Sequence, residues 1–211
     1  DLHNSEHSFP TRRSSDLQAE AHALGVATAR VHHDLATAFP TEVLTGPRID
    51  DMVARLHDRL AVAVGLVPAL QPMAAGLHDR LDGLRGIEKI TVQRVHGDYH
   101  LGQALRTPKG WRVLDFEGEP GGDMASRRVL DHPMRDVAAM LRSFAYAAWQ
   151  GADNSPAARA WQEASEAAFL EGYGADAADN DVLLEAYSID KAAYEARSEE
   201  RRVGKECSEL C

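Results

Sequence analysis

The spacing of apolar residues constrains the fold of this chain most. Apolar side chains recur every three or four positions in six segments, which is the spacing of one face of an α-helix. In the first segment this face runs through Leu24, Ala27, Val31 and Leu35. The predicted helices are Glu20–Phe39, Ile49–Val67, Ala69–Gly86, Asp131–Trp149, Pro156–Tyr173 and Asp179–Tyr194.

The region between the third and fourth predicted helices has strand character instead. Lys89–Val95 and Trp111–Phe116 read as two short strands, and Thr107–Gly110 has the residues of a turn between them. Six or so helices around one short hairpin leave too little sheet for a doubly wound α/β fold. We therefore expect a mostly α domain of the α+β class.

The two ends of the chain lack this periodicity. Residues 7–17 and 197–207 can be back-translated into two DNA strands that are reverse complements of each other, read in different frames. The agreement continues outward through residues 1–6 and 208–211, and this DNA resembles a sequencing adapter. We expect residues 1–17 and 197–211 to be non-native scars, and residues 18–196 to be the native domain.

Composition and charge exclude several classes of protein. Both cysteines, Cys207 and Cys211, fall in the expected C-terminal scar, so neither a disulfide framework nor a cysteine metal site is expected. The net charge of −10 and the lack of a basic stripe argue against nucleic acid and anionic membrane as partners. No apolar run approaches the roughly 18 residues that a membrane-spanning helix requires.

The residues that carry chemistry gather around the strand region. Asp98 is followed five residues later by Gln103, and Asp115 ends the segment Trp111–Leu114. Phosphoryl transfer requires a carboxylate to orient and deprotonate the acceptor hydroxyl, and Mg²⁺ to neutralise the phosphates. This order of carboxylate, amide and carboxylate is typical of kinase catalytic loops. It predicts Asp98 as the base and Gln103 and Asp115 as oxygen ligands of Mg²⁺.

Three neighbouring residues have less specific roles. Glu117 either helps to hold a second Mg²⁺ through water or caps Gly118. His96 is expected to hold the catalytic loop by side-chain hydrogen bonds, and His100 to be a packing residue more often than a ligand. A zinc site on these two histidines is excluded because no third nitrogen or sulfur ligand follows nearby.

The sequence of the strand region also resembles a known family. His96-Gly97-Asp98 resembles the catalytic loop of the aminoglycoside-phosphotransferase-like kinases, with Gln103 where that broad group has Asn. Residues 110–120 (GWRVLDFEGEP), the Arg127-Arg128 pair, residues 135–148 (RDVAAMLRSFAYAA) and residues 189–195 (IDKAAYE) add a resemblance to bacterial maltokinases.

That resemblance implies the C-terminal lobe of a protein-kinase-like fold, with ATP and Mg²⁺ as cofactors. It also implies phosphorylation of maltose to maltose 1-phosphate. ATP use and the absence of cysteines from residues 18–196 lead us to expect a cytoplasmic location. A related sugar kinase, such as a glucosamine kinase, remains an alternative. So does a catalytically inactive sugar-binding or regulatory module.

Two helices are expected to supply the substrate residues. Asp190 and Tyr194 share one face of the last helix, and Lys191 and Glu195 share another. By resemblance these four residues line the sugar pocket, and an ordinary solvated Lys191–Glu195 pair is the alternative.

Arg135 and Asp136, at the start of an earlier helix, are expected near the substrate, and a salt bridge that fixes the helix is the alternative for Arg135. The other histidines of the helices are expected to be surface or packing residues: His32, His33, His57 and His78.

The nucleotide-clamping half of such an enzyme is not found in residues 18–196. A covering loop over the phosphates, a strand lysine and a Walker P-loop are all absent from this range. We therefore expect the chain to be inactive alone although its parent phosphorylates a sugar. Fusion of the parent to, or association with, another enzyme of trehalose or maltose metabolism is a further possibility.

Overall fold

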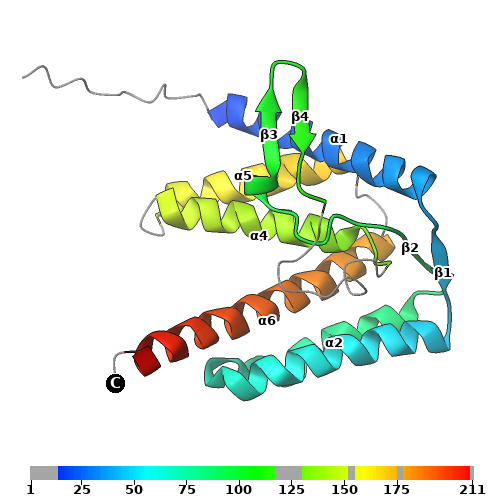
Figure 1. Cartoon of the computed structure of the whole chain (residues 1–211), viewed down its shortest axis with the longest axis vertical. Helices are drawn as coiled ribbons and strands as arrows, with labels where there is room; N and C mark the ends of the chain where they lie inside the picture. Colours follow the sequence, from blue (N-terminus) through cyan, green and yellow to red (C-terminus); the bar gives the residue numbers. More distant parts are fainter. Residues whose placement is uncertain (1–13, 117–129, 152–154, 175–177, 210–211) are drawn as a thin grey trace, which may run out of the picture.

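The computed structural model describes residues 14–116, 130–151, 155–174 and 178–209. These residues form six α-helices, three short 3₁₀ helices and four short strands (Figure 1). The first half contains α1 (Ser14–Ala38), β1 (Glu42–Leu44), α2 (Pro47–Leu66), η1 (Pro68–Met73), α3 (Ala74–Asp82), η2 (Gly83–Gly86) and β2 (Ile90–Val92). The second half contains η3 (Leu101–Gln103), β3 (Ala104–Thr107), β4 (Gly110–Val113), α4 (Met134–Gly151), α5 (Pro156–Tyr173) and α6 (Ala178–Glu209).

Helices α1 and α5 pack closely along each other. The contact is made possible by two glycines that face the opposite backbone. A β-carbon built at Gly25 would overlap the carbonyl oxygen of Phe169, and one at Gly172 would overlap that of His22. Gly174 then ends α5 in the left-handed conformation with φ of 78°, as is common after a helix C-terminus.

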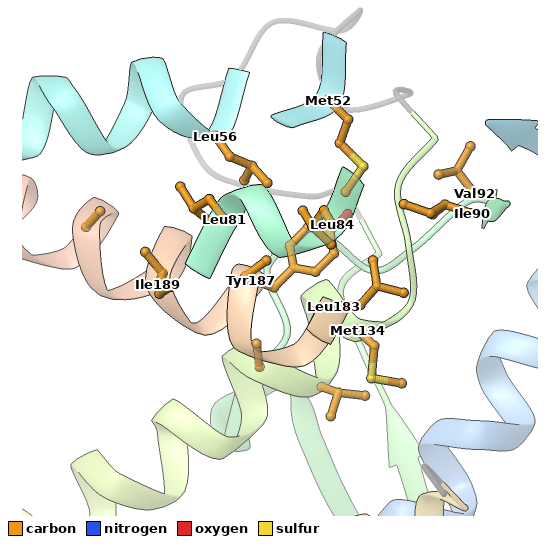
Figure 2. Packing of buried hydrophobic residues seen from close by; sticks show 14 of the residues in the cluster. Met52, Leu56, Leu81, Leu84, Ile90, Val92, Met134, Leu183, Tyr187 and Ile189 are labelled. Carbon is orange, nitrogen blue, oxygen red and sulfur yellow. The ribbon is translucent and has the colours of Figure 1, made fainter. Parts of the chain in front are cut away.

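Helix α6 packs against both α2 and α4 and so joins the two halves of the domain. Figure 2 shows the apolar core at this junction, where Tyr187 and Leu183 of α6 lie beside Leu84 and Met134. Within the part of the chain described here, no helix has the length and apolar character needed to cross a membrane.

The third predicted helix is divided into pieces. Residues 69–86 form parts of η1 and η2 on either side of the nine-residue α3. Pro72 lacks a backbone N–H, and Gly83 and Gly86 favour an early end, so one continuous helix does not form.

The strands pair differently from the sequence prediction. β2 lies within the predicted strand Lys89–Val95, but it pairs antiparallel with β1, which the sequence did not indicate. The predicted strand Trp111–Phe116 overlaps β4, whose partner is β3 across a turn at Pro108 and Lys109. The turn was therefore predicted correctly, and the pairing of the two predicted strands was wrong.

The β3–β4 hairpin lies against α1 (Figure 1). Trp111 Nε1 donates to the Glu20 carbonyl oxygen at 3.1 Å, and Arg106 Nε lies 2.6 Å from the Glu20 carboxylate. These contacts fix the position from which the chain leaves β4 toward Asp115.

Both end helices extend into the predicted scars. Ser14–Leu17 begins α1, and Arg197–Glu209 continues α6. Helical structure does not depend on the origin of a segment, so the predicted origin of these residues stays a prediction.

Candidate active site

His96 joins the two segments that carry the predicted catalytic residues. Its ring is buried, with 3% of the residue exposed. Nε2–H donates to the Leu114 carbonyl oxygen at 2.7 Å, and Nδ1 accepts from the Asp98 backbone N–H at 3.3 Å. The ring therefore holds Asp98 beside the residue that precedes Asp115, in the loop-holding geometry expected for His96.

Gln103 and Asp115 are in direct contact. Gln103 Nε2 donates to Asp115 Oδ2 at 3.1 Å, and Leu114 N–H donates to the Gln103 carbonyl oxygen at 2.9 Å. Asp115 has φ of 60°, and it is the one non-glycine residue with positive φ in the described part of the chain. Aspartate tolerates this conformation better than most residues, and such backbone is frequent at functional sites.

The donor atoms of these two side chains fit Mg²⁺, which prefers carboxylate and amide oxygens. Among the described residues, no three His, Cys, Asp or Glu side chains cluster as metal ligands. The third predicted ligand, Glu117, lies outside the described residues, as does the Arg127-Arg128 pair. The described part of the site thus offers one carboxylate and one amide.

His100 acts on the short helix η3. Its Nδ1 accepts from the Gly102 backbone N–H at 3.0 Å, which caps η3 at its N-terminus. Gln103 N–H donates to the His100 carbonyl oxygen at 2.9 Å. His100 therefore shapes the backbone that presents Gln103.

Asp136 lies beneath the catalytic loop and not on a substrate surface. It is 1% exposed. Oδ2 accepts from His96 N–H at 2.7 Å, and Oδ1 accepts from Gly97 N–H at 2.9 Å. Burial by itself raises the pKa of Asp136, but hydrogen bonds from His32 and from the backbone N–H groups of His96 and Gly97 outweigh it and lower the pKa. This geometry does not place Asp136 among substrate contacts; it anchors the turn before Asp98.

A cavity of about 90 Å³ opens between the catalytic loop and α6. Gly97, which precedes Asp98, forms part of its wall. Three of the four predicted α6 residues line it together with Arg135 of α4: Asp190, Lys191 and Tyr194. Four of the six predicted substrate residues, from α4 and α6, therefore meet at one cavity next to the catalytic loop.

Ion pairs order the wall of this cavity. Arg59 Nε lies 2.6 Å from Asp190 Oδ1, and Arg135 Nη1 lies 3.0 Å from Asp131 Oδ2. Burial raises the pKa of Asp190, and the ion pair with Arg59 opposes that shift. The salt bridge is the alternative that the sequence left open for Arg135.

Other residues of α6 differ in how they relate to this cavity. Glu195 does not line it, because its carboxylate pairs with Arg142 Nε at 2.6 Å. The sequence left open an ordinary Lys191–Glu195 pair. In the structure Lys191 Nζ lies 5.3 Å from the centre of the Tyr194 ring, and Glu195 pairs with Arg142. Arg197, the first residue of the predicted C-terminal scar, also lines the cavity.

Two buried polar residues of α1 were missed as functional candidates. His32 contacts Asp136, and Thr28 Oγ1 lies 2.8 Å from the hydroxyl of Tyr99, the residue after Asp98. His32 had been expected to be a surface or packing residue. The sequence could have indicated both residues, because Thr28 and His32 follow Leu24 at intervals of four and so lie on the same buried helix face.

Comparisons with known proteins identify relatives of this chain. Over 163 residues the chain is 32% identical to a glucosamine kinase from Streptacidiphilus jiangxiensis, which is 71% of this chain and 36% of that protein. No protein-family model matches the chain.

Solved structures of glucosamine kinase share the fold. One crystal form aligns with a TM-score of 0.80 and 26% identity, over 92% of this chain and 52% of that one. A complex with glucosamine, ADP and inorganic phosphate aligns with a TM-score of 0.79 and 26% identity, over 92% of this chain and 53% of that one. The expected kinase-like, mostly helical fold is confirmed, and the chain spans about half the length of these structures.

Proposed function

Because the chain is homologous to glucosamine kinase, we propose that it forms the catalytic lobe of an ATP-dependent sugar kinase whose acceptor is glucosamine. Maltose was the acceptor that the sequence favoured, and none of the relatives named above supports it. The glucosamine alternative fits them better, since one of these structures holds glucosamine and ADP.

One observation carries the proposal most directly. The His96 ring links the backbone at Asp98 to the carbonyl of Leu114, while Gln103 contacts Asp115. These contacts support the proposal because they hold the backbone at Asp98 near the segment that carries Asp115, and Gln103 beside Asp115. Phosphoryl transfer needs this positioning more than covalent chemistry by the protein.

Each described residue has a defined task in the proposed reaction. Asp98 orients a sugar hydroxyl and accepts its proton as the new O–P bond forms and the bond from the γ-phosphorus to the leaving ADP breaks. Gln103 and Asp115 would hold Mg²⁺, which would neutralise phosphate charge. The cavity between Gly97 and α6 receives the sugar, with Asp190 and Tyr194 at its wall.

The test requires the full-length protein. ADP release with Mg²⁺-ATP is measured against glucosamine, maltose, glucose and an aminoglycoside, and strong release is expected with glucosamine. Release with maltose alone would keep the fold and the catalytic residues and reject the acceptor. A purely sugar-binding module would show binding without Mg²⁺-dependent ADP release.

Two substitutions assign the roles. Asp98→Asn should lower kcat by about 10²–10⁴-fold with little change in nucleotide affinity. Asp115→Asn should raise the Mg²⁺ concentration needed for half-maximal rate; asparagine also tolerates positive φ, so the backbone is kept. Asp79→Asn, at an exposed position of α3, is the matched control. A near-wild-type kcat for Asp98→Asn removes it from the mechanism.

A further inference from the structure

His32 of α1 is a buried histidine with a partner on each ring nitrogen. The residue is 5% exposed. Its Nε2 lies 3.0 Å from Asp136 Oδ2, and its Nδ1 lies 2.8 Å from the Tyr173 hydroxyl. These contacts bring together three helices that are far apart in sequence: α1, α4 and α5.

For a neutral ring, the Asp136 carboxylate fixes the tautomer. Asp136 is ionised, as the lowered pKa of its carboxyl indicates, so it accepts a hydrogen bond from Nε2–H. Nδ1 of that tautomer accepts from the Tyr173 hydroxyl, which keeps its proton because burial raises the pKa of Tyr173 well above its ordinary range. The neutral ring with its proton on Nε2 satisfies both contacts.

The Asp136 carboxylate in turn holds the catalytic loop. Besides His32, it accepts from the backbone N–H groups of His96 and Gly97. Gly97 has φ of 84°, so the chain turns at the residue directly before Asp98. The direction in which Asp98 leaves this turn therefore depends on how the carboxylate is held.

The backbone of α1 adds a second connection to the same region. The Gln93 side-chain amide donates to the His32 carbonyl oxygen at 2.7 Å. Gln93 and Asp131 also form a two-way backbone bridge, N–H to carbonyl oxygen in each direction at 2.9 and 2.8 Å. The segments before the catalytic loop and before α4 thus meet beside His32.

We propose that His32 is a positioning residue of the phosphoryl transfer, which acts on Asp98 through Asp136. Without the His32 hydrogen bond, a buried carboxylate would lose one of its three donors and with it the fixed orientation toward His96 and Gly97. Displacements on the order of 1 Å at a catalytic group lower rates by about 10²-fold. The role in catalysis rests on the proposed function, while the role in loop order does not.

The first measurement follows loop order in the 211-residue chain by hydrogen exchange of the Gly97 amide. His32→Leu should raise this exchange rate about tenfold or more, because a hydrogen bond to a charged group is lost. His32→Gln should stay near the wild-type rate, since its amide N–H can still donate to Asp136. His33→Leu, at the exposed neighbouring position, is the control and should leave Gly97 unchanged.

The second measurement follows kinetics in the full-length enzyme. His32→Leu should lower kcat by roughly 10–100-fold with nearly unchanged KM for ATP, and His32→Gln should restore most of the rate. If the wild-type enzyme phosphorylates no sugar, the proposed function is rejected. The exchange rate of the Gly97 amide then still decides whether His32 positions the loop.

Two results would overturn the proposal. One is a folded His32→Leu chain whose Gly97 exchange stays within twofold of wild type. The other is a His32→Gln enzyme as slow as His32→Leu. If His32→Leu does not fold, Tyr173→Phe decides: loss of the donor to Nδ1 should raise Gly97 exchange several-fold, and no change refutes the positioning role.

Discussion

His132 makes the stability of this domain sensitive to mild acid. Its Nδ1 accepts a hydrogen bond from Met134 N–H at 3.2 Å, at the start of α4. Burial lowers the pKa of His132 to about 4, against the opposing effect of Asp131. Protonation would place a proton on the nitrogen that has to accept this hydrogen bond, at a helix terminus that already disfavours positive charge.

The sign and the size of the effect follow from linkage. The unfolded chain binds a proton near pH 6.5 and the folded chain only near pH 4, so stability is lost as pH falls between these values. Between pH 7 and pH 5 this difference amounts to up to about 2 kcal/mol of unfolding free energy. His132 is partly exposed, and screening by solvent makes that figure an upper value.

Urea denaturation of the 211-residue chain at pH 7, 6 and 5 measures this loss. His132→Asn is the informative variant, because the Asn carbonyl oxygen can still accept from Met134 N–H and does not titrate. Its unfolding free energy should fall less between pH 7 and pH 5 than that of the wild type, by up to about 2 kcal/mol.

Other titrating groups are common to both proteins and cancel in this difference. Burial raises the pKa of Asp190 and Glu166, so these groups increase the unfolding free energy as pH falls. Burial lowers the pKa of His57, so His57 decreases the unfolding free energy as pH falls. His33→Asn, at an exposed position, should follow the wild type. Parallel curves for wild type and His132→Asn would refute the assignment to His132.

The helices give three further predictions, all measured by urea denaturation at neutral pH. Gly25→Ala should destabilise the chain by about 1–3 kcal/mol or more, because its β-carbon would overlap the Phe169 carbonyl oxygen in the α1–α5 contact. Gly65→Ala, which meets open space in α2, should instead stabilise by up to about 1 kcal/mol. Ser155→Ala should cost about 1 kcal/mol, because Ser155 Oγ accepts from Ala158 N–H at the N-terminus of α5. Equal stabilities for Gly25→Ala and Gly65→Ala would contradict the close backbone approach.

Local periodicity predicted the helices well because the signal lies within each segment. The predicted Pro156–Tyr173 coincides with α5, since Ser155 and Gly174 mark both ends. Strand pairing was not predictable in the same way. β1 has three residues, too few to show alternation, and its pairing with β2 is a contact between distant segments.

In the candidate site, too, local patterns were predicted better than features that depend on the three-dimensional fold. The spacing from Asp98 to Gln103 is local, and in the structure Gln103 donates a hydrogen bond to Asp115. The roles of these residues in catalysis and metal binding stay predictions. The sequence analysis also placed both Arg135 and Asp136 near the substrate. Successive helical residues point about 100° apart, so Arg135 reaches the cavity while Asp136 turns beneath the loop.

The face of α1 shows what a sharper use of the sequence could have found. The predicted face ran through Leu24, Ala27, Val31 and Leu35, and of these only Leu24 is fully buried. The other fully buried side chains of the described part of α1 are Ala21, Thr28 and His32. Counting apolar residues alone passed over the last two, because both are polar. A polar side chain on a buried stripe costs free energy unless it finds a partner, and here the partners are Tyr99 and Asp136. Both partners adjoin or hold the turn that carries Asp98, so the polar positions of α1 mark where this helix supports the catalytic loop.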